Sequence, residues 1–417
     1  MHRIYTSLIL LLIAAIAAAA DPTATTYSWA ECQGSARPYP APQAVTAHPD
    51  SLTPIMINHV GRHGARFAAN NKHYATLLNA LEQAKKLGTI TPKGKALATL
   101  IQQAINRTAG RWGALDSLGM AEQRGIAARL CAAYPSLIRN SRVEALSSYA
   151  PRCIMSMYEF THQISRMDNH VEIYTSSGRQ NSELMRFFDL SEDYRLYRES
   201  DALKNKLAEY TAQTITYEPL KRILGDKYPL DETASDVAMA QYSALAGLAA
   251  IGMTCDITQY FTTQEYNALW GIFNLRQYLQ RTASTLSSVP ADIASPLLLD
   301  LIHTTDKFIA DSTSMAPIQL RFGHAETLMP LLSLMHLKGC YYLTNYFDTV
   351  GLHWRDFHIV PMAANLQLIL FRSQSGELYL RTDLNEVPVP LIPNESTIYV
   401  PWQKARAYLE RCVPIYY

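Results

Sequence analysis

The stretch 54-PIMINHVGRHGAR-66 joins a short apolar segment to a loop in which His63 lies between Arg62 and Arg66. Its first seven residues, Pro54–Val60, are mostly apolar, and their length and composition are typical of a buried β-strand. A strand of this kind holds the residue at its end in a fixed place. We therefore expect this stretch to form one strand of a sheet and to present His63 just beyond the strand end.

The residues around His63 suit chemistry on a phosphoryl group. A neutral imidazole is a competent nucleophile, and two guanidiniums beside it can neutralise the non-bridging oxygens while the bond to the leaving group breaks. Gly61 and Gly64 relax the limits on φ, so the backbone can turn sharply and come close to an anion. The pattern predicts phosphoryl transfer to His63; the alternative is a solvated loop that contains one histidine and two arginines.

The bulk composition is that of an ordinary globular protein. The chain has 417 residues, which is enough for one large domain or two smaller ones, and 48% of them are hydrophobic. The net charge is +1, whereas a nucleic-acid or anionic-membrane partner requires a basic excess. We therefore expect no nucleic-acid partner, and any anion must be bound by a local cluster of charges.

Residues 1–20 have the pattern of a secretory signal peptide. Arg3 provides a positive charge, residues 8–16 form an apolar core, and three alanines precede Asp21 at the expected cleavage site. The alternative is a membrane anchor, but the apolar run over 7–20 is shorter than the ~20 residues that span a bilayer. We expect an exported protein, periplasmic, cell-surface or secreted, without a stable membrane span after cleavage.

All six cysteines follow the predicted signal peptide. An even number in an exported chain permits up to three disulfides, but sequence does not determine their pairing. We expect at most two bridges, the remaining cysteines being buried thiols. No two of them form a Cys-x-x-Cys motif, so a zinc-ribbon or thioredoxin-type site is not indicated. The cysteines are Cys32, Cys131, Cys153, Cys255, Cys340 and Cys412.

The order of strand and helix patterns indicates an α/β fold. Strand patterns occur near both ends of the chain, whereas residues 182–302 are mainly helical and too numerous for a loop. We expect a mixed central sheet flanked by helices, with an inserted, mainly helical cap domain. The expected α/β domain comprises residues 54–68, 115–175 and 305–417, and the expected cap comprises 69–114 and 176–304. The expected strands are 54–60, 142–148, 171–175, 317–322, 365–372, 378–382 and 386–391.

Two further segments add chemistry to the His63 loop. His324 and Glu326 lie between a predicted strand and a predicted helix, where free helix N–H groups and the positive dipole end attract an anion. His324 can donate to a phosphate oxygen, and Glu326 can protonate an alkoxide, which is a poor leaving group without a proton. The alternative for Glu326 is a carboxylate that only stabilises the helix N-terminus. Arg152 follows the predicted strand 142–148 and a Ser-Ser turn, and its alternative is a surface arginine.

In this chain order, the three segments resemble the histidine acid phosphatase family, the branch of the histidine phosphatase superfamily that includes phytases. Residues 61-GRHGAR-66 match its signature, apart from the proline that usually follows soon after the second arginine. Residues 145-ALSSYAPRCIMS-156 look like the segment that contains the family's third phosphate-binding arginine. Residues 118-LGMAEQRG-125 and 361-PMAANL-366 are similar to two further family segments, and the resemblance extends over residues 54–392.

The proton-donor motif departs from the usual pattern of the family. Most members have His-Asp, whereas here Ala325 follows His324 and Glu326 comes next, which is similar to the multiple inositol polyphosphate phosphatase subgroup. The segment 183-ELMRFFD-189 also looks like that subgroup. The resemblance implies stepwise removal of phosphates from phytate, an inositol polyphosphate, through a phosphohistidine on His63. It further implies that Arg62, Arg66, Arg152 and His324 bind the phosphoryl group and that Glu326 is the general acid.

Residues beside these segments are candidates for contacts with substrate phosphates other than the one that is removed. Lys72 and His73 follow the His63 loop, where they can meet peripheral phosphates of a polyanionic substrate; the alternative is a solvated helix start. We name Lys72 as the substrate-binding candidate of the two. Arg186 either contacts substrate or pairs with Asp189, and we favour the pairing.

We expect neither a metal ion nor a cofactor, because the arginines already supply the positive charge that phosphoryl transfer needs. His59, four residues before His63, is expected to pack beneath the loop rather than to bind a metal. The expected protein is a monomeric phosphatase with a small phosphorylated substrate. One alternative is a broad acid or sugar phosphatase of the same fold. The other is an exported phospho-ligand-binding protein without turnover, which we disfavour because the nucleophile and the candidate acid are both present.

Overall fold

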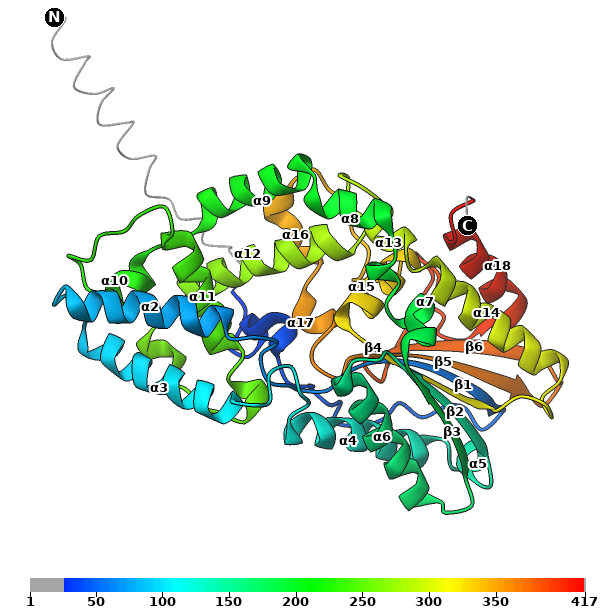
Figure 1. The fold of residues 1–417 in the computed structure, drawn as a ribbon. Helices are drawn as coiled ribbons and strands as arrows, with labels where there is room; N and C mark the ends of the chain where they lie inside the picture. The colour runs from blue at the N-terminus through cyan, green and yellow to red at the C-terminus, as the bar shows by residue number, and fades with distance from the viewer. Residues whose placement is uncertain (1–25, 416–417) are drawn as a thin grey trace, which may run out of the picture.

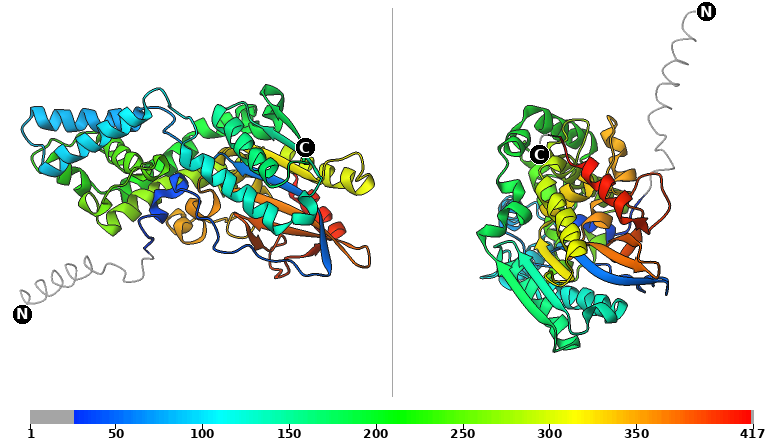
Figure 2. Two further views of the ribbon diagram at one scale, coloured as in Figure 1. Left: turned by 90° about the horizontal axis from the view of Figure 1, so that it is seen from below. Right: turned by 90° about the vertical axis from the view of Figure 1, so that its right-hand side faces the viewer.

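The computed structural model describes residues 26–415, which form an elongated molecule with a sheet at one end and a group of helices at the other (Figures 1 and 2). The predicted signal peptide, residues 1–20, lies outside the described residues. The strands are β1 (Leu52–Arg62), β2 (Arg142–Ser147), β3 (Glu172–Ser177), β4 (Ile318–Gly323), β5 (Asn365–Ser373), β6 (Leu378–Leu384), β7 (Val387–Val389) and β8 (Val400–Pro401). They form one sheet in the order β3-β2-β4-β1-β5-β6-β7, with β8 paired to β6. This mixed sheet, flanked by helices, confirms the predicted fold class.

The parallel half of the sheet brings three distant parts of the chain to one edge. Strand β4 runs parallel to both β1 and β2, whereas β5 is antiparallel to β1. The register pairs Arg62 with Gly323 and Ser147 with Phe322. Parallel strands end at the same edge, so the residues that follow β1, β2 and β4 meet there, as in other open α/β sheets. His63 is therefore placed beside His324 by strand register rather than by loop conformation.

Both faces of the sheet are covered, because alternate residues of β1 point to opposite sides. Ile57 packs with α4 (Ser117–Ala133) and α6 (Pro151–Met167) in one buried cluster. Met56 and Val60 pack on the other side, in the cluster that includes α14 (Ser295–Ala310), α15 (Ala325–Leu334) and α18 (Trp402–Cys412). Each fully buried aliphatic side chain contributes about 1.5–3 kcal/mol, so the central strand is held firmly from both sides.

The helical end has a hydrophobic core of its own. It is formed mainly by helices α2 (Lys72–Lys86), α3 (Pro92–Thr108), α10 (Glu218–Leu224), α11 (Ala234–Ala246) and α12 (Thr263–Arg281). In Figure 1 the first four of these lie away from the sheet, and α12 runs from this end towards it. The expected division into an α/β domain and a cap stays a prediction; its boundary at residues 304 and 305 lies inside α14, whose apolar side packs with the sheet.

The sequence patterns missed one helix and left the number of disulfides open. No pattern predicted α18, although Trp402, Ala405 and Leu409 recur at helical spacing and pack in the cluster that also contains β5 residues. The six cysteines are all free thiols, and Cys32, Cys131 and Cys340 lie in three different hydrophobic clusters, which keeps them apart. Within residues 26–415, no helix is long and apolar enough to cross a membrane.

The loop after β1 is held against α4 by two glycines in direct backbone contact. A Cβ on Gly64 would lie 2.4 Å from the carbonyl oxygen of Gly119, and a Cβ on Gly119 would lie 2.2 Å from that of Ala65. Side chains fix the same backbone: the amide of Ala65 donates to Glu122 Oε2 (2.6 Å), and the amide of Gly64 donates to Ser156 Oγ (3.2 Å). The loop can occupy this position only because both residues at the crossing lack a side chain.

We predict that Gly119→Ala lowers the free energy of unfolding by about 1–3 kcal/mol, the range for a forced overlap in a packed interior. Urea denaturation measures this change. Gly351→Ala is the matched control, because its added Cβ meets only the Trp270 ring at 3.5 Å, an ordinary contact. Equal stability of the Gly119 variant and the wild type would show that the loop can move away from α4 without cost.

Candidate active site

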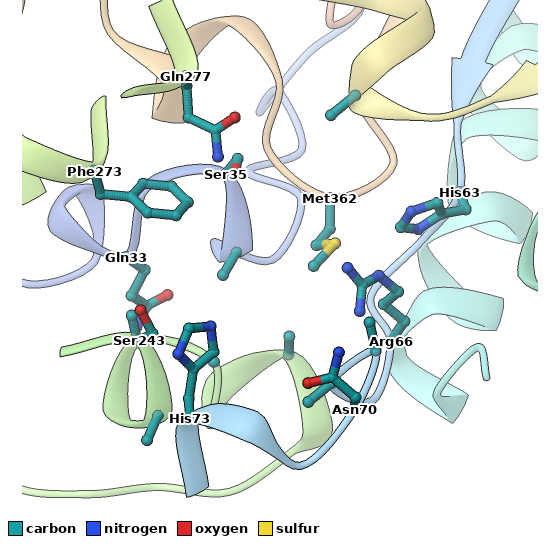
Figure 3. A pocket seen from close by; sticks show the side chains of 18 of the residues that line it. Gln33, Ser35, His63, Arg66, Asn70, His73, Ser243, Phe273, Gln277 and Met362 are labelled. Carbon is teal, nitrogen blue, oxygen red and sulfur yellow. The ribbon is translucent and has the colours of Figure 1, made fainter. Parts of the chain in front are cut away.

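A cavity of about 340 Å³ lies between the sheet edge and the helical end. Figure 3 shows His63 and Arg66 on one side of it and His73, Ser243 and Phe273 on the other. Segments from both regions therefore contribute to its wall. The structure places five of the predicted site residues in the lining: Arg62, His63, Arg66, Arg152 and Glu326.

His63 is a buried, neutral imidazole, only 3% exposed. Its Nδ1 lies 2.9 Å from the carbonyl oxygen of Gly64. Because a carbonyl oxygen only accepts, Nδ1 bears the proton and Nε2 keeps its lone pair. Burial, together with the charges of Arg62, Arg66 and Arg152, holds the pKa of His63 well below its ordinary value. The side chain is thus held in the protonation state of a nucleophile.

Backbone carbonyls hold the two arginines of the loop. Arg62 Nη1 donates to the carbonyl oxygens of Ser35 (2.7 Å) and Val360 (2.5 Å), and Arg66 Nη1 donates to that of Phe67 (2.8 Å). Burial and repulsion from neighbouring guanidiniums lower the pKa of Arg62 to about 9 and that of Arg66 to about 10, so both remain cationic at neutral pH. Their Nε–H groups are buried and have no partner within the described chain. Donors left in this state favour an anionic ligand.

His324 lies beside His63, with the two ring centroids 5.8 Å apart. Its Nδ1 faces Arg152 Nη2 at 3.2 Å, and its Nε2 faces both Arg186 Nη1 and Ser148 Oγ at 2.9 Å. Burial and the charge of Arg152 lower its pKa to about 3, so the ring is neutral. A neutral imidazole offers one acceptor nitrogen, and guanidinium donors face both nitrogens. Only one of the two guanidiniums can therefore donate a hydrogen bond to the ring.

Glu326 follows Ala325, the first residue of α15, and forms an ion pair with Arg281. Arg281 Nη2 lies 2.7 Å from Glu326 Oε1. Enclosure raises the pKa of this carboxyl, but the charge of Arg281 and the nearby His324 outweigh it and hold the pKa below its ordinary value. In the empty site Glu326 is a carboxylate.

The remaining candidates lie as follows. Lys72 is exposed at the first position of α2 and does not line the cavity, whereas the adjacent His73 does. Arg186 donates from Nε to Asp189 Oδ2 (2.6 Å) and still reaches His324. His59 is fully buried, with its ring 4.9 Å from that of Phe160, so it packs beneath the loop. Within the described chain, no group of three or more His, Cys, Asp or Glu is arranged to hold a metal ion.

Sequence patterns did not identify Arg281, the fourth arginine in the cavity wall. It is the last residue of α12, far in sequence from every motif of the site. Arg66 and Arg152 flank a histidine or a turn with a recognisable spacing, whereas Arg281 ends an ordinary amphipathic helix. Only the packing of α12 against α15 shows that its side chain meets Glu326.

Asp356 supports the site from behind. The fully buried carboxylate accepts hydrogen bonds from the Ser35 amide (2.6 Å) and from Trp270 Nε1 (3.0 Å). Gly34 adopts φ +59°, and a Cβ there would lie 2.7 Å from Asp356 Oδ2, so this contact requires glycine. Asp356 thereby fixes the segment whose Ser35 carbonyl holds Arg62. Burial raises the pKa of Asp356 to about 6.

A neutral imidazole surrounded by guanidiniums, with a carboxylate nearby and an α/β sheet beneath, suits the binding of a phosphoryl group. The chain belongs to the histidine phosphatase superfamily (branch 2), whose family model matches residues 55–385. This confirms the resemblance noted from the sequence.

Individual proteins agree with this assignment. Multiple inositol polyphosphate phosphatase 1 of Gallus gallus is 27% identical over 85% of this chain and 81% of its own length. The Homo sapiens protein of the same name is 26% identical over 69% of this chain and 63% of its own. The solved multiple inositol polyphosphate phosphatase of Bifidobacterium longum, in complex with inositol hexasulfate, has a TM-score of 0.73 at 18% identity, covering 91% of this chain and 97% of that one. The phytase of D. castellii has a TM-score of 0.71 at 15% identity, covering 96% and 89%. The two structures show a shared fold.

We predict that Asp356→Asn removes part of the pH dependence of stability. The raised pKa means that folding favours the protonated carboxyl; this contribution is complete below the ordinary value of 3.8 and is lost as pH rises through about 6. Asparagine does not titrate. The free energy of unfolding of the wild type, relative to that of the variant, should therefore fall as pH rises from about 4 to about 7. Urea denaturation at several pH values measures the difference, and a difference independent of pH would contradict the prediction.

Proposed function

We propose that this protein is an exported phosphomonoesterase that removes phosphates stepwise from inositol polyphosphates, phytate included, through a phosphohistidine on His63. The observation that carries the proposal is the unprotonated Nε2 of the buried His63 within a cluster of arginines. The substrate class is supported by the relatives, two of which are multiple inositol polyphosphate phosphatases. Export rests on the signal-peptide pattern of residues 1–20.

In the first step, Nε2 of His63 attacks phosphorus while the bond from phosphorus to the leaving oxygen breaks. Arg62, Arg66 and Arg152 neutralise the non-bridging oxygens, and the neutral His324 hydrogen-bonds to the same group. Glu326 in its protonated form gives its proton to the departing alkoxide, which leaves as an alcohol. The products of this step are a phosphorylated His63 and an ionised Glu326.

In the second step, water attacks the phosphohistidine. The ionised Glu326 now accepts a proton from that water, because the reverse of a step that needs an acid needs the corresponding base. Phosphate leaves, and His63 regains its lone pair. The same two residues thus serve each phosphate in turn, which fits stepwise release.

The proposal includes Lys72 as a contact for peripheral phosphates. Its exposed position at the start of α2, next to the cavity-lining His73, supports a contact only with a substrate that extends out of the cavity. We also propose that the protein acts as a monomer, with the α/β domain and cap divided as the sequence patterns indicate.

We predict that His63→Ala abolishes phosphate release from phytate and from p-nitrophenyl phosphate, because His73, the other imidazole among the described lining residues, lies on the opposite side of the cavity from the arginines. Acid quenching of the wild type during turnover should trap phosphohistidine, and the variant should give none. Resolving the phytate products over time tests the stepwise order. A wild type that forms no phosphohistidine and releases no phosphate would be a binding protein instead.

We predict that Glu326→Gln slows hydrolysis of inositol phosphates by about 10²–10⁴-fold, the usual contribution of a general acid. Hydrolysis of p-nitrophenyl phosphate should fall much less, because its leaving group needs little protonation. The comparison is made by kcat/KM on both substrates. Equal losses on the two would place the proton donor elsewhere. A wild type that favours p-nitrophenyl phosphate over phytate would point to a broad acid or sugar phosphatase of the same fold.

A further inference from the structure

The positive charge of the cavity comes from four arginines, three of which surround His63. Among the described lining residues, the charged side chains are Arg62, Arg66, Arg152, Arg281 and Glu326. His73, on the far side, has a pKa lowered by burial and by neighbouring cations, which favours its neutral form. The rest of the lining is uncharged. A second phosphate inside the cavity therefore has one cation left to meet, which is Arg281.

Arg281 already has an anionic partner in the empty cavity. It pairs with Glu326 and also hydrogen-bonds to Gln277 Oε1, one turn earlier on α12. Its buried Nε–H has no partner within the described chain. Its guanidinium is thus fixed at the cavity wall between the helical end and the candidate proton donor.

The ion pair with Arg281 keeps Glu326 ionised, whereas the first step of the reaction needs Glu326 in its protonated form. A general acid must carry a proton when the leaving oxygen departs, whereas a carboxylate beside a guanidinium is ionised. The pair must weaken before the first step, and the substrate is the source of charge that can weaken it.

Charge balance shows which substrates can do so. Four guanidiniums and one carboxylate give the empty cavity a net charge of +3. A phosphomonoester has a charge of about −1.5 to −2 near neutral pH. One such group leaves the net charge of the cavity positive, which does not favour protonation of Glu326. Two such groups bring the cavity to neutral or negative, and protonation of Glu326 then restores the balance.

We propose that Arg281 is a specificity-determining residue, which exchanges Glu326 for a second phosphate of the substrate and so frees Glu326 to act as the acid. This inference rests on the proposed function and adds a preference to it: a phosphate is removed fastest when another phosphate lies next to it on the ring. The second phosphate of the substrate thus helps to bring the general acid into the protonated form that removes the first phosphate.

The proton balance of the exchange is simple. Glu326 takes one proton from solvent as the second phosphate binds to Arg281. It gives that proton to the leaving oxygen as the bond between phosphorus and nitrogen of His63 forms. It recovers one from the attacking water in the second step and returns it to solvent as the ion pair with Arg281 forms again, so each turnover consumes only substrate and water.

Other groups also act on Glu326 and are present in every substrate complex. Apart from Arg281, the titratable and charged groups that influence it include His324 at the N-cap of α15, Arg62 at the end of β1, Arg66 of the loop after β1, Cys153 of α6, and Tyr194 of α8 (Glu192–Glu199). Arg281 differs from them in its direct contact with the carboxylate.

The test compares an inositol bisphosphate whose phosphates are on adjacent carbons with the corresponding monophosphate. The wild type should favour the bisphosphate by kcat/KM, and Arg281→Gln should reduce this ratio at least tenfold. The high-pH limb of monophosphate hydrolysis should also move to higher pH in Arg281→Gln, because loss of the guanidinium lets Glu326 keep its proton longer. Arg281→Lys, which retains a cation, should restore most of the ratio.

Arg222→Gln is the matched control. Arg222 forms an ion pair with Glu265, near the other end of α12 and outside the cavity lining. The Arg222→Gln variant should leave both the bisphosphate-to-monophosphate ratio and the high-pH limb of monophosphate hydrolysis unchanged, even if the variant is less stable. Equal losses on the two substrates in Arg281→Gln, with an unmoved pH limb, would overturn the inference while leaving the proposed function in place. A wild type that releases phosphate from neither substrate would overturn both.

Discussion

The site is built around guanidiniums that repel one another and surround one neutral imidazole, and the rest of the structure has to hold them together. Bringing like charges together in a poorly solvated site is costly, and the cost has to be offset locally. The offsets here are mostly backbone carbonyls rather than acids: Arg62 and Arg66 donate to main-chain oxygens, and only Arg281 has a carboxylate within the cavity. Carbonyls hold the donors in place without cancelling their charge. The cavity lining therefore keeps a net positive charge.

Sheet register makes this concentration of charge possible. The residues that follow β1, β2 and β4 share one edge because these strands are parallel and in a fixed register. The helices on both faces hold β1 rigidly, and the paired glycines Gly64 and Gly119 let the loop lie directly on α4. From the other side, the segment around Ser35 reaches Arg62, and Asp356 fixes that segment. The sheet thus sets the positions of the site residues, and contacts from the N-terminal segment and the helical end hold their side chains.

The sequence allowed the α/β class and the local parts of the site to be predicted. His63 and its two arginines are contiguous, and strand patterns before His63 and His324 indicate that both follow strands of the sheet. Residues that are close in sequence can be placed in this way, because one loop or one strand end fixes their relative positions. The pairing of strands that brings the two histidines together followed only from the family resemblance.

Arg281, Ser35 and Asp356 could not be found in this way, because their roles arise from tertiary packing. Arg281 lies at the end of a helix whose pattern is ordinary, and it meets Glu326 only because α12 crosses towards α15. Asp356 acts through a main-chain amide, which leaves no mark in the sequence. The helix α18 was missed for a related reason: its apolar residues are few and its surface is largely polar, so its burial depends on the sheet it covers.

The crowding of His324 by Arg152 and Arg186 has a consequence for the protein as a whole. The imidazole has guanidinium donors at both nitrogens, and the neighbouring guanidiniums have Nε–H groups without a partner in the described chain, so the site holds more donors than acceptors. Inorganic phosphate, the product of a phosphatase, has the negative charge and the acceptor oxygens that such donors bind. Ligand that binds only the folded state raises stability in proportion to the logarithm of its concentration. A phosphate ion bound at this site would act in two opposing ways, as a competitor of substrate and as a ligand that raises the free energy of unfolding.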